Sequence, residues 1–219
     1  MDAAINTPSL FLVKHSLAIR IWHWVTFVLF TSTIVTVLLA NTMFDTKSNI
    51  EMVQNQVKEK GGNITSVQAR SVSHEYNDKL WNTHKIIGYF LCFSLLSRII
   101  IEFATSKEEK ISSRIKYATN LSKSVNDNTN SKHYLTVKYT YLIFYFLFLL
   151  MAATGLVLAY EDVEFLKPIQ SSVRSIHEFG QYCIYGFIVI HLVGVIRSDV
   201  TENPGIISKM INNGKSTVG

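Results

Sequence analysis

Apolar stretches alternate with polar segments along this chain, and four of the stretches are nearly free of charge. They cover residues 21–40, 80–101, 139–160 and 179–196. A helix needs about 20 mostly apolar residues to cross the hydrocarbon core of a bilayer, and each stretch approaches or exceeds that length. Lys85 and Arg98 lie close enough to the ends of the second stretch to extend their charges to the membrane surface. The pattern predicts an all-α membrane protein, a bundle of four transmembrane helices, with spans at about 17–40, 80–103, 136–160 and 174–197.

The connecting segment 41–79 has helical signals of its own. Ser48, with Glu51 three positions later, predicts a capping box that starts a short helix, and the glycines at 61–62 end it. A second helical stretch is expected to begin near Thr65 and to run into the second span. A solvated connector is the alternative, although a segment of this length is also sufficient to dock a partner.

The distribution of lysine and arginine predicts which side of the membrane each segment faces. With both termini inside, 13 of the 21 basic residues are cytoplasmic and the other 8 are outside, as the positive-inside rule requires. The segment 41–79 is then outside, and the segment 104–135 and the tail 198–219 are cytoplasmic. In the cytoplasmic segment, Ser106 and Glu109 predict a capping box before a basic amphipathic surface, with a solvated connector as the alternative.

Composition agrees with a membrane protein and limits its partners. Hydrophobic residues make up 48% of the 219 residues, and the mean hydropathy is +0.20. We assign the net charge of +5 to contact with anionic lipid headgroups and not to nucleic acid. A single membrane domain is expected over residues 1–219. The sequence leaves the oligomeric state open, a homo-oligomer included.

Four histidines lie inside the predicted spans and form two pairs by depth. His177 and His191 are 14 positions apart, which on a helix is about 21 Å of rise and nearly the same face. His23 lies at the cytoplasmic level of His191, whereas His84 lies at the outer level of His177. Each pair draws on two different helices, as ligation of a haem iron by two imidazoles requires. Because an ionisable group in a span needs a partner, these histidines are the candidate metal ligands.

The residues around these histidines suit a bulky planar cofactor. Three glycines follow a histidine by three or four positions and share its helix face: Gly88, Gly180 and Gly194. Three basic residues lie within three positions of a histidine: Arg20, Lys85 and Arg174. We expect them to pair with haem propionates or with lipid phosphates. The sequence has no C-x-x-C-H motif, so covalent attachment of haem is not indicated.

Other readings of the histidines remain open. His15, His74 and His133 have no partner at their depth and are expected at the surface. A non-haem metal or proton transporter would use acidic residues at mid-membrane, and the four apolar stretches contain none. A purely structural membrane anchor would not explain why the histidines pair by depth.

Several of these residues stand in motifs that resemble a known family. The motifs are Arg20-Ile-Trp-His23-Trp24, His84 with Gly88-Tyr89 and Arg98, Thr154-Gly155, and His177 with His191. Over roughly residues 14–215, they are similar to the bacterial cytochrome b561 and nickel-iron hydrogenase b-type cytochrome superfamily. The tail from Asp199 through 205–215 is similar to the hydrogenase-type subgroup, whereas both long connecting segments are unmatched.

The resemblance implies a four-helix bundle that encloses two b-type haems in a bacterial inner membrane. By that analogy His84 and His177 hold the outer haem, and His23 and His191 hold the inner one. Such a subunit passes electrons between an extracytoplasmic hydrogenase- or dehydrogenase-like partner and the quinone pool of a respiratory chain. The alternative within the superfamily is a stand-alone cytochrome b561 that reduces quinone directly. Quinone is the implied substrate of the oxidoreductase, and in relatives with an outer partner its site is commonly near the inner haem.

Overall fold

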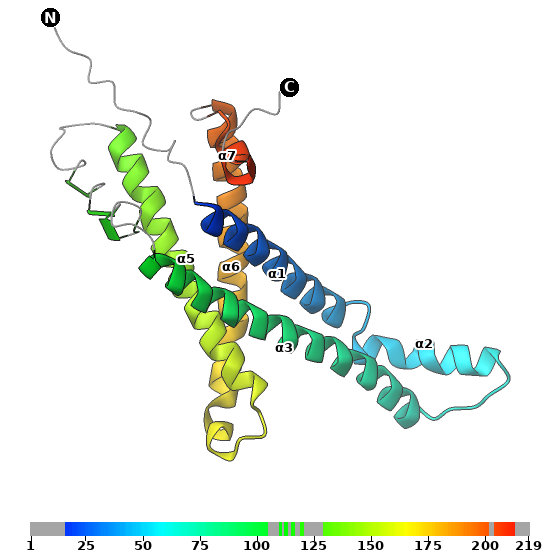
Figure 1. The fold of residues 1–219 in the computed structure, drawn as a ribbon. Coiled ribbons are helices and arrows are strands. Elements are labelled where there is room, and N and C mark those ends of the chain that lie inside the picture. Colours follow the sequence, from blue (N-terminus) through cyan, green and yellow to red (C-terminus); the bar gives the residue numbers. More distant parts are fainter. Residues whose placement is uncertain are drawn as a thin grey trace, which may run out of the picture. The chain divides into compact units, whose positions relative to one another are not determined.

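The computed structural model describes a chain of long helices (Figure 1). The described residues are 16–104, 110, 112–113, 115–116, 119–120, 129–201 and 204–212, with backbone alone for 129–134. Within them the elements are α1 (Leu17–Asn41), α2 (Thr46–Glu59), α3 (Ser66–Ala104), α5 (Thr129–Ala159), the 3₁₀ turn η1 (Glu164–Leu166), α6 (Lys167–Thr201) and α7 (Ile206–Asn212). No strand occurs in these ranges. The expected capping box at Ser106 and Glu109 lies outside the described residues.

Four helices in the described part of the chain are long and apolar enough to cross a membrane. They confirm the predicted fold class, an all-α protein with four spans. Two of the helices begin well before the apolar stretches do, because α3 starts at Ser66 and α6 starts at Lys167. The polar residues 66–79 contain neither glycine nor proline, so nothing in that segment interrupts the helix before the apolar stretch begins.

Hydroxyl side chains in the apolar part of α1 donate hydrogen bonds to backbone carbonyls of the same helix. Thr31 and Ser32 donate hydrogen bonds to the carbonyls of Phe27 and Val28, over 2.9 and 2.8 Å. Thr36 donates in the same way to the Thr33 carbonyl over 2.7 Å. Lipid offers no hydrogen-bond partner, so these internal bonds let polar side chains remain in a spanning helix.

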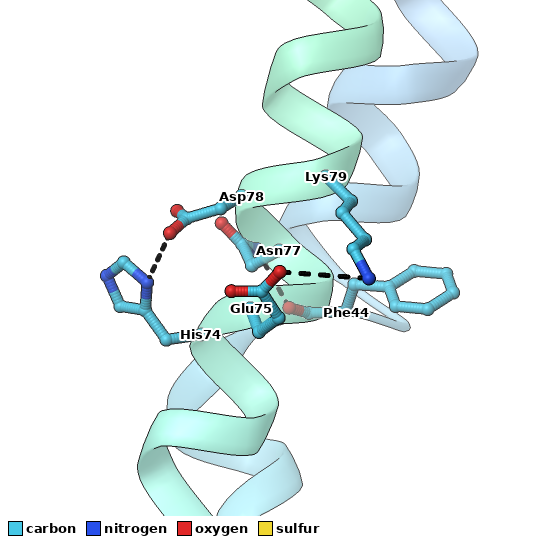
Figure 2. A network of polar contacts seen from close by, with 6 residues as sticks. All are labelled: Phe44, His74, Glu75, Asn77, Asp78 and Lys79. Carbon is cyan, nitrogen blue, oxygen red and sulfur yellow. Dashed lines mark hydrogen bonds and ion pairs between the residues drawn. The ribbon is translucent and has the colours of Figure 1, made fainter.

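The chain divides into two compact units, of which one is formed by residues Trp24–Ser94. Here the hydroxyl groups of Thr26 and Ser94 lie 2.6 Å apart and join α1 to α3. At the other end, the Asn77 side-chain amide donates to the Ala40 carbonyl over 3.0 Å and to the Phe44 carbonyl over 2.8 Å, and Figure 2 shows the bond to Phe44. The Ala40 carbonyl belongs to the last turn of α1 and lacks a partner within that helix. Asn77 therefore satisfies the helix end and fixes it against α3.

Helix α2 starts two residues earlier than the sequence pattern suggested. The expected cap at Ser48 is wrong, because Asp45 is the N-cap and its Oδ1 accepts the Ser48 backbone N–H over 2.9 Å. Aspartate and serine are equally good N-caps, so the Ser48–Glu51 spacing was not sufficient to locate the start of the helix. The hydrogen bond from the Ser48 backbone lowers the pKa of Asp45. The helix ends at Glu59, and Gly61 then adopts a positive φ of 78°.

The other unit contains Met1–His23 and Leu95–Gly219. In it α5 and α6 form a helical hairpin through η1, and they lie side by side in Figure 1. Phe148 and Ile184 are buried in this unit. The packing is close at Gly180, where a Cβ atom would come within 2.7 Å of the Met151 sulfur. Glycine at this position therefore lets the two helices approach each other.

Candidate functional site

Two of the four intramembrane histidines face each other within one unit. His23 lies in the second turn of α1 and His191 in the second half of α6, and both are partly buried. Their ring centres are 6.3 Å apart, with the ring planes at 61°. Phe187, one turn before His191, stacks on the His191 ring at 5.8 Å and 8°. The pairing by depth predicted that these two imidazoles would come together across two helices.

A run of aromatic rings continues from this pair into the α5–α6 hairpin. Phe187 stacks on Phe144 with 4.8 Å between ring centres. Phe144 in turn contacts Tyr145, and the Tyr145 ring lies 6.2 Å from Trp22, the neighbour of His23 in the sequence. The histidine pair is thus held by flat, rigid rings on α5 and α6.

Arg98 lies beside this aromatic run and is buried, with 7% of its surface exposed. Its Nε donates to the Tyr145 hydroxyl over 3.0 Å, and its Nη2 contacts Glu102 over 3.0 Å. The guanidinium also lies over the rings of Trp22 and Tyr145, at 5.8 and 5.7 Å. The expectation that Arg98 extends to the membrane surface is therefore wrong, because its side chain is buried in the unit and two of its three nitrogens have partners there.

Two buried guanidinium nitrogens near His23 have no hydrogen-bond partner in the described residues. One is Nη1 of Arg98. The other is Nε of Arg20, which stands one turn before His23 and whose Nη1 donates to the Ile211 carbonyl over 3.0 Å. A buried charged donor without an acceptor is costly. Both atoms are therefore suited to an anionic oxygen, which none of the described residues supplies.

His177 is positioned by two adjacent residues of α5. Its Nδ1 lies 2.8 Å from the Thr154 hydroxyl oxygen. A Cβ atom at Gly155 would come within 3.3 Å of the His177 Cε1, so glycine lets the imidazole rest against the α5 backbone. Thr154 is buried, with 7% of its surface exposed. The α5–α6 hairpin thereby fixes the direction of the His177 ring.

His84 has a similar neighbour in the other unit. Its Nδ1 lies 2.9 Å from the hydroxyl oxygen of Thr36 on α1, and Thr36 is likewise buried. Trp81, one turn earlier on α3, meets the His84 ring edge to face at 5.5 Å. Neither threonine was among the predicted site residues. The sequence contained one signal that could have identified them. Each of Thr36 and Thr154 lies at the membrane depth of a histidine on another helix.

The other predicted site residues occupy varied surroundings. At Gly88 and Gly194, a Cβ atom would meet no described atom within 4 Å, whereas Gly180 packs against Met151. Lys85 is partly buried and Arg174 is exposed. His74 is exposed and pairs with Asp78 over 2.7 Å (Figure 2), in keeping with its surface assignment. His15 and the side chain of His133 lie outside the described residues.

Within the described ranges, no three side chains of His, Cys, Asp or Glu lie together as ligands for a metal ion. A haem iron needs only two protein ligands, because the porphyrin supplies the other four nitrogens.

Cys92 and Cys183 are both free thiols and partly buried.

One comparison with known proteins gives a match. The family model described as prokaryotic cytochrome b561 matches residues 14–213, nearly the whole chain. No curated protein and no solved structure gives a significant match.

Proposed function

The chain belongs to the prokaryotic cytochrome b561 family, and we propose that it carries two haem b groups, each held between two histidines. As a family member it is a bacterial membrane protein that binds haem b and transfers electrons, and its apolar helices contact lipid. Bound haem supplies one-electron chemistry, whereas the chain supplies axial ligands, burial and hydrogen bonds that set the reduction potential.

The inner haem is assigned to His23 and His191. Two metal–nitrogen bonds of about 2 Å, plus about 1 Å from each nitrogen to its ring centre, place two ligating imidazoles about 6 Å apart. The observed separation of 6.3 Å between the two ring centres is the observation that carries the proposal. Aromatic rings that pack edge to face have similar separations, so the haem content of the ligand variants distinguishes the two arrangements.

The arginines near His23 fit the polar edge of that haem. Propionate carboxylates need charge-assisted donors when they lie away from water. The buried Nη1 of Arg98 and the buried Nε of Arg20 are donors without a described partner. We assign these two arginines to the inner propionates. For the outer haem, we predict that Arg174 and Lys85 pair with the propionates.

The outer haem is assigned to His84 and His177. Each imidazole is buried in part and has its Nδ1 beside a threonine hydroxyl, which leaves Nε2 as the nitrogen able to bind iron. The separation of 14 positions between His177 and His191 corresponds to about 21 Å along α6. Two haems at these levels would carry an electron from one side of the membrane to the other.

In the proposed reaction, electrons pass between an extracytoplasmic hydrogenase- or dehydrogenase-like partner and the membrane quinone pool. Oxidation of one quinol would release two electrons and two protons, and haems held by the two histidine pairs would supply two one-electron acceptors. The excess of basic residues supports cytoplasmic termini, 13 of 21 on that side. The segment 41–79, which contains α2, would then be available to the partner.

A stand-alone cytochrome b561 that exchanges electrons with quinone by itself is the second candidate. The two proposals share both haems and differ only in the partner. The α2 segment and the extension of α3 to Ser66 favour a subunit with a partner, because they form a helical structure beyond the apolar stretches.

Replacement of single ligands tests the haem assignment. We expect about two haem b groups per purified chain by the pyridine haemochrome assay, and about one in His23→Ala or His84→Ala. The double variant His177→Ala with His191→Ala should contain less than one, because α6 contributes to both sites. His74→Ala, on the exposed surface, is the matched control and should keep the full content. A full haem content in both single variants would contradict the ligand scheme.

Cysteine labelling tests the orientation. In a chain with Cys92→Ala and Cys183→Ala, a cysteine introduced at Lys58 should react with a membrane-impermeant maleimide in intact spheroplasts. A cysteine introduced at Lys116 should react only after the membrane is opened. Both positions carry exposed side chains, so they differ mainly in the side that they face. The opposite labelling pattern would show the reverse orientation, and the inner and outer haems would exchange names.

Reduction by quinol tests the substrate. A short-chain menaquinol or ubiquinol, added to the oxidised purified protein, should produce the α-band of ferrous haem b within seconds. The same quinol with the His23→Ala variant should reduce less haem and do so more slowly. If dithionite reduces the haems but no quinol does, exchange with the quinone pool is ruled out, while the haem assignment stands.

A further inference from the structure

We infer that Thr36 and Thr154 are positioning residues, which hold the Nδ1–H of His84 and His177 and so direct each Nε2 to iron. This inference rests on the proposed function, since it concerns the ligands of the outer haem. It adds two residues that bind neither iron nor substrate but determine the electron donation of both axial ligands.

The single hydroxyl hydrogen of Thr154 decides which nitrogen of His177 carries a hydrogen. A threonine hydroxyl carries a single hydrogen. The Thr154 Oγ1 lies 2.7 Å from the Leu150 carbonyl, which can only accept a hydrogen bond, so the hydroxyl hydrogen is used there. The contact of 2.8 Å between Thr154 Oγ1 and His177 Nδ1 must then be donated by the imidazole. His177 therefore carries its hydrogen on Nδ1, and Nε2 is its unprotonated nitrogen.

The same reasoning applies to Thr36, in the other unit of the chain. Its hydroxyl donates to the Thr33 carbonyl over 2.7 Å, and its oxygen is 2.9 Å from His84 Nδ1. Because the hydroxyl hydrogen is used at the Thr33 carbonyl, the imidazole is the donor in its contact with Thr36. Each threonine thus connects a histidine to the threonine's own helix. The imidazole donates to the hydroxyl, and the hydroxyl donates to a backbone carbonyl.

Burial makes this arrangement necessary. Thr36 and Thr154 are each 7% exposed, so water is a poor substitute for either hydroxyl. A histidine whose second nitrogen donates to an acceptor is a more basic ligand and is fixed in ring orientation. A more basic axial imidazole stabilises ferric haem over ferrous haem and lowers the reduction potential. The threonines therefore lower the potential of the outer haem and slow its loss.

Threonine-to-valine variants test the inference, because valine keeps the shape and removes the hydroxyl. In Thr154→Val or Thr36→Val we expect one of the two haems to titrate at a more positive midpoint potential, while the other is unchanged. Transfer of haem to apomyoglobin should become roughly tenfold faster for one haem per chain. Thr154→Ser and Thr36→Ser restore the acceptor and should return both quantities toward the wild-type values.

Matched controls exist on the same helices. Thr140 on α5 and Thr31 on α1 also donate to their own backbone, over 2.7 and 2.9 Å. Thr140→Val and Thr31→Val should leave the potentials and the haem loss unchanged. If a valine variant fails to accumulate, Thr154→Ala and Thr36→Ala carry the same test, because alanine also removes the acceptor.

The outcomes separate this inference from the proposed function. Unchanged potential and unchanged haem loss in the valine and alanine variants, with two haems bound, would overturn the role of the threonines alone. A shift that serine does not restore would also overturn it, since it would report packing and not the hydrogen bond. A wild-type protein without haem would overturn the proposed function instead.

Discussion

A polar group inside a membrane has no water to bind, so each one in this protein must find its partner within the chain or in a cofactor. Thr31 and Ser32 meet that constraint on their own helix backbone. Arg98 meets it in part, through Tyr145 and Glu102. The groups that remain unmatched are therefore the most informative, and in the described residues they include two guanidinium nitrogens close to His23.

The same constraint connects the helices to the proposed electron transfer. An imidazole in a span is unfavourable unless both of its nitrogens are used. Hydroxyls of Thr36 and Thr154 occupy one nitrogen of His84 and His177, and iron would occupy the other. For His23 and His191, the gap of 6.3 Å between ring centres fits an iron between them. Phe187 stacks on the His191 ring and so restricts its orientation.

The sequence was sufficient for the fold class because uncharged stretches of about 20 residues have few alternatives to a spanning helix. Details that depend on contacts between helices were harder to predict. Thr36 was not singled out in the sequence and Thr154 was named only within a family motif, because their histidine partners are 48 and 23 positions away. Arg98 was expected at the surface because it stands near the end of a stretch, and only the structure shows Tyr145 and Glu102 beside it. Similarly, Asp45 and Ser48 are equally good caps, so the start of α2 was decided by geometry.

The central claim, that each haem iron lies between two histidines, is tested most directly by electron paramagnetic resonance of the fully oxidised, purified protein. Ferric haem with two imidazole ligands is low-spin, whereas an iron with an open or weakly occupied axial position is high-spin. We predict two low-spin ferric signals that together account for all the haem iron. A high-spin signal that accounts for half of the iron or more would show that at least one haem lacks its second histidine, and would contradict the account.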